Sequence, residues 1–290
     1  MDLTIDLNRY RLTQPATVHL DHWPTSIPPL SESKKHYETL LEQYRNEISE
    51  RQSVLYAHNR YALLLIFQGM DTSGKGGAIK HVMSGVNPQG CQVYSFGPPS
   101  DEELDHDFLW RSNRCLPERG RIGIFDRSYY EEVLIVRVRP DILARQRIPA
   151  EHLHPETLWL HRYLDINALE AYLHRNGTRI LKFFLHLSPD EQRKRLLARI
   201  DDPAKNWKFN LHDLDARDQW NDYQQAFSQC LEHTATPHAP WHIIPADDKR
   251  NARLLVSKIL VDTLNSLDIA YPTLSTEQRE NLQRARQRLT

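Results

Sequence analysis

Residues 62–77 read Ala-Leu-Leu-Leu-Ile-Phe-Gln-Gly-Met-Asp-Thr-Ser-Gly-Lys-Gly-Gly. The first six residues form a continuous apolar run, which is typical of a strand buried on both faces of a parallel sheet. Residues 69–75 then match the phosphate-loop spacing G-x-x-x-x-G-K, and we expect a helix to begin near Ala78. In such a loop, inward-facing N–H groups, the helix N-terminus and the lysine surround phosphate oxygens. The alternative is a glycine-rich turn that binds nothing. If the loop binds phosphate, the residues that we expect to do so are Gly69, Ser73, Gly74, Lys75, Gly76 and Gly77.

The hydroxyl residue that normally follows the lysine of this loop is replaced by Gly76. A magnesium ion bound here would therefore need other oxygen ligands. Asp71 lies inside the loop, and Asp126 follows a predicted strand at 121–125, where a carboxylate commonly orients magnesium in phosphoryl-transfer sites. A lone aspartate after a strand is more often a turn former, but its combination with the loop favours a metal pair of Asp71 and Asp126.

Four further strands are predicted, at 92–96, 121–125, 179–187 and 241–244, with helical segments between them. The helices are expected at about 31–58, 100–115, from 128 onward, 156–176, from 189 onward, 213–232 and 251–267. Because parallel strands need crossover connections, this alternation predicts an α/β three-layer sandwich with a five-stranded, mostly parallel sheet.

The ends of the chain differ from this central pattern. Residues 1–30 contain four prolines and predict an extended N-terminal arm, laid over the core or over a neighbouring subunit. Residues 31–270 are predicted to form one α/β domain. Residues 271–290 have one apolar side at best and are expected to form a C-terminal tail that frays.

Bulk composition excludes several classes of protein. The 290 residues contain 37 Lys plus Arg against 38 Asp plus Glu, so the net charge of −1 gives no general attraction to nucleic acid. No apolar run approaches the ~20 residues of a membrane helix. No secretion signal is legible at the N-terminus and the three cysteines are scattered, so we expect a cytoplasmic protein with reduced thiols.

Two basic segments stand out against this neutral background. Nine arginines and no lysine occur in residues 111–147, and arginine favours bidentate phosphate contacts. A second set, Arg193, Lys194, Arg195 and Arg199, lies on the helix expected after Ser188. Either this helix has an ordinary solvated face, or residues of about 188–212 form a lid that closes cations over a phosphate chain.

Several linked motifs resemble those of the polyphosphate kinase 2 family. They are residues 69–77, Gly-Met-Asp-Thr-Ser-Gly-Lys-Gly-Gly; 85–90, Gly-Val-Asn-Pro-Gln-Gly; 106–111, His-Asp-Phe-Leu-Trp-Arg; 123–132, Gly-Ile-Phe-Asp-Arg-Ser-Tyr-Tyr-Glu-Glu; and the basic segment 191–199 followed by Asp202-Pro203 and Asn206-Trp-Lys208. The resemblance spans about residues 37–267. It implies a P-loop kinase-like fold, Mg²⁺ with Mn²⁺ as a substitute, and a homo-oligomer, dimer or tetramer. The implied reaction transfers a phosphoryl group between inorganic polyphosphate and nucleoside mono- or diphosphates: AMP, ADP and, by extension, GMP and GDP.

The resemblance also implies roles for individual residues. Asp71 and Asp126 resemble the essential acids of the family. The expected phosphate ligands are Lys75, Arg127, Arg193 and Lys194, and Arg111 resembles part of the nucleotide or chain-binding wall.

Glu131 marks the subgroup. Its tract, residues 130–134, resembles the members that act on both mono- and diphosphates, and we expect Asn at this position in diphosphate-preferring members. A carboxylate there would select the acceptor by repelling an extra phosphate or by holding a second metal. Asp126 departs from the dual-acting pattern, which often has Asn there.

Rival functions remain for the sequence alone. An ATP-dependent nucleotide or nucleoside kinase would share the fold, although the missing hydroxyl after Lys75 counts against it. A nucleotide-regulated binding module without turnover would not need Asp71, Lys75 and Asp126 together. A purely structural α/β domain would bind no polyphosphate.

Overall fold

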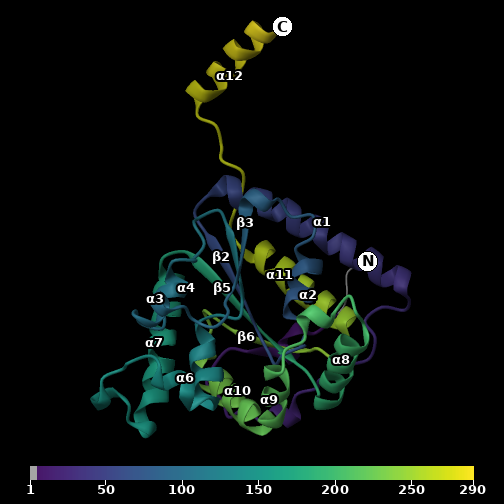
Figure 1. The fold of residues 1–290 in the computed structure, drawn as a ribbon. Coiled ribbons are helices and arrows are strands. Elements are labelled where there is room, and N and C mark those ends of the chain that lie inside the picture. Colours follow the sequence, from purple (N-terminus) through teal and green to yellow (C-terminus); the bar gives the residue numbers. More distant parts are fainter. Residues whose placement is uncertain (1–4) are drawn as a thin grey trace.

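A central six-stranded sheet organises the computed structural model, which describes residues 5–290 (Figure 1). The strand order is β1-β6-β5-β2-β4-β3. Within this sheet β2, β3, β4, β5 and β6 run parallel, which confirms the predicted class. The strand bounds are β1 Arg11–Leu12, β2 Ala62–Gln68, β3 Cys91–Ser95, β4 Ile122–Asp126, β5 Thr178–His186 and β6 Trp241–Pro245.

The predicted number of strands was wrong by one, because the N-terminal arm contributes β1. This two-residue strand pairs antiparallel with β6, with Arg11 opposite His242 and Leu12 opposite Trp241. The arm is also held by Asn251, whose side chain accepts from Leu30 N and donates to Ile27 O. The arm therefore covers the core of its own chain.

Alternate residues of strand β2 pack into two different hydrophobic cores, one on each face of the sheet. In β2, Leu63, Leu65 and Phe67 belong to one hydrophobic cluster, and Leu64 and Ile66 belong to the other. Successive side chains of a strand point to opposite faces, so a strand that is apolar throughout must be covered on both sides. All seven residues of β2 are buried, as the apolar run predicts.

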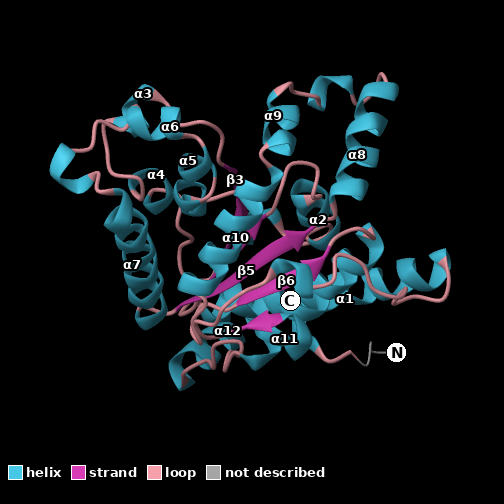
Figure 2. Cartoon of the chain, turned by 90° about the horizontal axis from the view of Figure 1, so that it is seen from below, coloured by secondary structure: helices cyan, strands magenta, loops and turns pink. Residues whose placement is uncertain are grey.

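Helices cover both faces of the sheet and complete three layers (Figures 1 and 2). The first core contains α1, α2 and α11, and the second contains α7 and α10. The α-helices are α1 Lys34–His58, α2 Lys75–Val82, α3 Asp101–Leu104, α4 Trp110–Asn113, α5 Ile135–Val138, α6 Pro140–Ala144, α7 Pro155–Arg175, α8 Pro189–Asp201, α9 His212–Asp218, α10 Trp220–Thr234, α11 Lys249–Ser266 and α12 Thr276–Leu289. The 3₁₀ helices are η1 Leu7–Tyr10, η2 Leu20–His22, η3 Pro88–Gly90, η4 Tyr129–Val133, η5 Ala150–His152 and η6 Asn206–Lys208.

Two predicted helices near the phosphate loop are corrected by the structure, and a third, expected over 213–232, is divided at Gln219 into α9 and α10. The helix expected over 100–115 is divided into α3 and α4, because Asp107 Oδ1 accepts from Leu109 N and starts a new turn between them. The helix expected from Ser128 is the 3₁₀ turn η4, capped by the Ser128 side chain, which accepts from Tyr130 N. The first two corrections lie beside the site described below.

The C-terminal tail forms a helix that projects away from the body of the molecule (Figure 1). Ser275 caps α12 with a capping box, yet every residue of this helix is exposed. None of the helices in residues 5–290 is long and apolar enough to cross a membrane. The three cysteines are free thiols, and Cys230 is buried in the second core.

Candidate active site

The phosphate loop connects β2 to α2 with a backbone that requires glycine. Gly69 has φ +150°, and a Cβ there would lie 2.8 Å from both Leu185 O and Ser73 Oγ. Gly74 has φ +103° and caps α2, which begins at Lys75 rather than near Ala78 as expected. Thr72 also has a positive φ of 65°, which is strained for a non-glycine residue. The loop is thus held in one specific shape at the carboxyl end of the sheet.

Lys75 turns back into its own loop. Its Nζ donates to Gly69 O at 2.7 Å and to Met70 O at 3.3 Å, and the side chain is buried. Burial and the nearby Arg127 lower the pKa of Lys75, whereas neighbouring carboxylates raise it. A buried cation whose charge is balanced by carboxylates is suited to binding phosphate oxygens.

Carboxylates gather on one side of the loop. Asp71 accepts a hydrogen bond from Arg127 Nη2 at 2.9 Å. Asp126 is the last residue of β4 and lies beside the loop. A Cβ atom placed on Gly76 would be 3.5 Å from Asp126 Oδ2. Burial opposes the charge of Arg127, but Glu131, Asp71 and Asp126 outweigh it and raise the pKa of the guanidinium. The predicted catalytic residues Asp71, Lys75, Asp126 and Arg127 are therefore brought together.

Glu131 lies on η4 within the same electrostatic cluster. Burial raises the pKa of the Glu131 carboxyl above its ordinary value, and Arg127 and Lys75 oppose this shift. The side-chain amide of Gln68 has partners for both of its polar atoms when its nitrogen donates to Glu131 Oε1 at 2.8 Å and its oxygen accepts from Ser128. Arg111, on α4, is near enough to lower the same pKa, and it also donates to Gly97 O at 2.8 Å. The predicted selectivity residue thus lies beside the predicted catalytic ones.

The carboxylates of Asp71 and Asp126 suit a magnesium ion that is also bound by substrate. Within residues 5–290 no group of three or more His, Cys, Asp or Glu side chains forms a metal site. Mg²⁺ in phosphoryl-transfer sites commonly takes only one or two carboxylates and completes its shell with water and phosphates. The Asp126 carboxylate accepts no hydrogen bond from the described residues, so its oxygens are available. Asp71 and Asp126 together fit such an ion.

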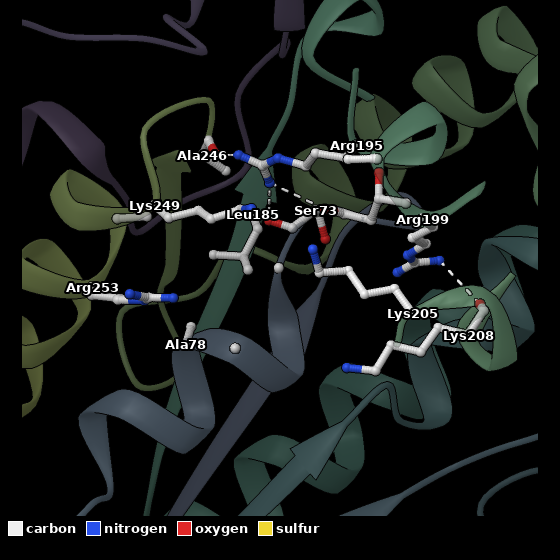
Figure 3. Close-up of a pocket in the computed structure, with 15 residues that line it drawn as sticks. Ser73, Ala78, Leu185, Arg195, Arg199, Lys205, Lys208, Ala246, Lys249 and Arg253 are labelled. Atoms are coloured by element: carbon white, nitrogen blue, oxygen red, sulfur yellow. Dashed lines mark hydrogen bonds between the residues drawn. The ribbon is translucent and has the colours of Figure 1, made fainter. Parts of the chain in front are cut away.

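A cationic pocket of about 270 Å³ lies against the loop (Figure 3). The loop contributes Thr72, Ser73, Gly74 and Gly77 to its wall. No carboxylate is among the described residues that line it. Its cations come from α8, the segment after α8, and α11: Arg195, Arg199, Lys205, Lys208, Lys249 and Arg253. The pocket is therefore suited to a polyanion.

Arg195 fastens α8 to the phosphate loop. Its Nη1 donates to Thr72 O and Ser73 O, each at 3.1 Å. Its Nη2 donates to Ala246 O at 2.7 Å and Asp247 O at 2.9 Å, and Nε pairs with Glu191 at 2.8 Å. Arg195 therefore supports the loop with hydrogen bonds at every nitrogen while it lines the pocket, and Arg199, four residues later, lines the same pocket.

Two predicted phosphate ligands lie elsewhere. Arg193 and Lys194 are on the exposed side of α8, outside the pocket lining, and Lys194 faces Glu191 at 3.9 Å. The sequence analysis missed Lys249 and Arg253, which line the pocket from the first turns of α11. Their four-residue spacing on one helix face was the available signal.

A parallel sheet with a phosphate loop, a carboxylate cluster and a cation-lined pocket at one edge defines a P-loop kinase-like phosphotransferase. The family model described as "Polyphosphate kinase 2 (PPK2)" matches residues 31–272, and the chain belongs to this family.

Two similar proteins and one solved structure support this assignment. The chain is 54% identical over 287 residues to the ADP-polyphosphate phosphotransferase of Rhodopseudomonas palustris, with 99% of each chain covered. It is 44% identical to the AMP/ADP-polyphosphate phosphotransferase of Meiothermus ruber, covering 79% of this chain and 81% of that protein. The crystal structure of polyphosphate kinase 2 from Arthrobacter aurescens superposes with a TM-score of 0.82 at 38% identity, covering 93% and 94% of the two chains.

Proposed function

We propose that this enzyme transfers a phosphoryl group between inorganic polyphosphate and the nucleotides AMP and ADP, with Mg²⁺ as cofactor and Mn²⁺ as a substitute. The proposal rests on one observation above all. The phosphate loop lines a pocket that holds six cations, and it also contributes Asp71 to a carboxylate cluster with Asp126 and Glu131. The printed names of the relatives from Rhodopseudomonas palustris and Meiothermus ruber, which specify ADP and AMP/ADP, support the choice of acceptors.

The cationic pocket fits the polyphosphate donor. Polyphosphate carries roughly one negative charge per repeating unit, so a protein of net charge −1 needs a local group of cations to hold it. Lys208 supplies this charge from the lid, and Lys249 and Arg253 supply it from α11. Arg199 and Lys205 also line the pocket, where they pair with Asp213 at 3.0 Å and with Asp202 at 2.6 Å and would exchange these partners for phosphate. The chain end would then lie at the N-terminus of α2, where the loop amides are.

The carboxylate side fits the reacting end of the nucleotide. Asp71 and Asp126 would hold Mg²⁺, which when bound neutralises charge on the phosphate oxygens. A phosphate oxygen of the acceptor attacks the terminal phosphorus, the bridging P–O bond breaks, and polyphosphate leaves one unit shorter. Lys75 and Arg127 provide positive charge on the equatorial oxygens, where the transition state carries it.

Acceptor choice is proposed to depend on Glu131. Its half-buried carboxyl lies beside Arg127 and Lys75, at the position where an additional acceptor phosphate would come closest to a negative charge. A diphosphate brings more negative charge than a monophosphate, so the carboxylate penalises it more. The negative charge of Glu131 thus favours the monophosphate relative to the diphosphate, which supports AMP as an acceptor in addition to ADP.

The direct test supplies polyphosphate and Mg²⁺ with AMP, ADP, GMP or GDP separately, and identifies the products by chromatography. We expect AMP to give ADP and ATP, and ADP to give ATP, with loss of activity on chelation and recovery with Mg²⁺ or Mn²⁺. A parallel reaction uses ATP as the sole donor to a nucleoside or to GMP. Turnover with ATP but none with polyphosphate would replace the proposal with an ATP-dependent kinase.

A further inference from the structure

A fully buried polar network lies beneath the turn that carries Glu131. Lys182 of β5 and Glu170 of α7 are both 0% exposed, and Lys182 Nζ donates to Glu170 Oε2 at 2.7 Å. Glu170 Oε1 accepts from Tyr129 Oη at 2.9 Å and from Tyr130 Oη at 2.7 Å. Lys182 Nζ also donates to Tyr130 Oη at 2.9 Å and to Thr234 O at 2.7 Å. Four elements, η4, α7, β5 and α10, therefore meet at one ion pair.

This network is costly to bury and is completely satisfied. Burial lowers the pKa of Lys182, while Glu170 raises it. Burial, followed by the charge of Glu170, raises the pKa values of the Tyr129 and Tyr130 phenols well above their ordinary range, so both keep the protons that they donate. A buried ion pair often stabilises a fold no more than well-packed apolar residues would. The specific effect of the Lys182–Glu170 pair is therefore to fix the positions of the helices and strands that its hydrogen bonds join.

A second set of contacts fixes the other end of the turn. Glu132 is 5% exposed and accepts from Arg162 Nε at 3.0 Å and from Gln146 Nε2 at 2.7 Å. Ser128 caps the start of η4 by accepting from Tyr130 N at 3.1 Å. Glu131 thus lies between Tyr130 and Glu132, which are both held by hydrogen bonds to other elements, and its own carboxyl interacts with the charges of Arg127 and Lys75.

We propose that the Lys182–Glu170 pair, together with the hydroxyl groups of Tyr129 and Tyr130, is a positioning unit that sets the place of Glu131 and so determines how activity divides between nucleoside monophosphates and diphosphates. This inference rests on the proposed function, because it needs Glu131 to face the acceptor. Tyr129 and Tyr130 belong to the turn itself, Glu170 and Lys182 hold their hydroxyl groups from α7 and β5, and the unit acts on Glu131 only through the turn.

The experiment compares Tyr130→Phe, Glu131→Asn and the double variant. The readout is the ratio of kcat/KM for AMP to kcat/KM for ADP, with polyphosphate as donor. We expect Glu131→Asn to lower this ratio and Tyr130→Phe to lower it in the same direction, by about fivefold, which is within the range of couplings between contacting residues. In the double variant, Tyr130→Phe should add nothing further, because the group that it positions has been removed.

Tyr163→Phe is the matched control. Tyr163 is also a buried tyrosine of the second core, and its hydroxyl accepts from Arg137 at 2.8 Å, but it has no contact with Glu170. This variant should leave the AMP to ADP ratio unchanged, whatever its melting temperature. If Tyr130→Phe is too unstable to assay, Tyr129→Phe removes one hydrogen bond to Glu170 and should shift the ratio in the same direction.

The outcomes separate this inference from the proposed function. Absence of polyphosphate-dependent transfer in the unmodified enzyme would refute the function itself. A ratio that shifts in Glu131→Asn but stays constant in both Tyr130→Phe and Tyr129→Phe would overturn the positioning unit alone. Additive effects in the double variant would overturn it as well, because they would mean that Tyr130 acts independently of Glu131.

Discussion

The carboxylate of Asp71 and the guanidinium of Arg127 form an ion pair at 2.9 Å that joins the phosphate loop to the end of β4. Arg127 makes this contact from a strained backbone, with φ 63°. A non-glycine residue in this conformation costs of order 1–3 kcal/mol, which the surrounding structure must offset. The strain directs the guanidinium toward the cluster of Asp71, Asp126 and Glu131, so we connect it with catalysis.

Asp71→Asn should nearly abolish phosphoryl transfer while the fold persists. The amide keeps the shape of the side chain but removes the charge that pairs with Arg127 and is proposed to hold Mg²⁺. We expect kcat to fall by about 10²- to 10³-fold, as for loss of other groups that stabilise a transition state. Steady-state kinetics and a thermal melt measure both quantities. Asp268→Asn, an exposed position after α11, serves as the control. Near-normal turnover of Asp71→Asn would refute the assignment.

Lys75→Ala should also abolish transfer, because it removes the one positively charged side chain of the phosphate loop, residues 69–75. Lys80→Ala provides a matched control on the same helix, since Lys80 is exposed. We expect a loss of at least about 10²-fold for Lys75→Ala and wild-type rates for Lys80→Ala. The measurement is single-turnover transfer from polyphosphate to ADP. Equal rates for the two variants would contradict the role of Lys75.

Removing pocket cations should weaken donor binding and spare the acceptor. In the double variant Lys205→Ala with Lys208→Ala, we expect the KM for long-chain polyphosphate to rise about tenfold, equivalent to ~1.4 kcal/mol. The KM for ADP should stay unchanged, because neither lysine contributes to the carboxylate cluster. The dependence of the polyphosphate KM on salt should also become shallower. A rise confined to the KM for ADP would place the donor elsewhere.

Arg195→Lys should destabilise the enzyme although it keeps the charge. A single ammonium group cannot reach the four carbonyl oxygens that the two ends of the guanidinium contact. We expect a loss of about 1–3 kcal/mol in the free energy of unfolding, the cost of leaving buried acceptors without donors. Denaturant unfolding measures it. Arg175→Lys, at the exposed end of α7, should be neutral.

His242 should make the fold sensitive to acid. Burial, with Arg11 nearby, lowers the pKa of His242 from 6.5 to about 3. The unfolded chain binds the proton more readily, so the stability contributed by neutral His242 is complete above pH 6.5 and is lost as the pH falls toward 3. Between pH 7 and pH 5 this loss is about 2 kcal/mol. Denaturant unfolding at both pH values should show a smaller loss in His242→Phe; an identical loss would exclude His242 as a source.

Much of the sheet could be predicted from sequence, because a parallel strand buried on both faces, such as β2, is apolar along its whole length; the edge strand β3 is mostly exposed and does not follow this rule. The five parallel strands lie within about two residues of their expected bounds. The strand β1 could not be predicted in this way. It has two residues, and its pairing with β6 depends on tertiary contacts that the proline-rich arm makes with β6 and with Asn251.

The proximity of Asp71, Lys75 and Asp126 could likewise be predicted, since Asp71 and Lys75 share a recognisable loop and Asp126 ends the neighbouring strand in space. The basic helix α8 could not be interpreted residue by residue. Sequence does not show that Arg195 turns inward to backbone carbonyl groups while Arg193 faces outward. The buried network around Lys182 was also invisible, because its members are separated by up to 105 positions, between Tyr129 and Thr234, and meet only in the folded chain.

If residues of about 188–212 act as the predicted lid, Arg195 determines which part of that lid can swing. Withdrawing the first two turns of α8 would leave a guanidinium and four carbonyl oxygens in a dry interior without hydrogen-bond partners, which is expensive. The fulcrum must therefore lie beyond Arg195, toward the end of α8. In that case the half of the helix before Arg195 would stay in place, and the half after it, which carries Arg199 and leads to Lys205 and Lys208, would be the part that lifts to admit a long polyanion.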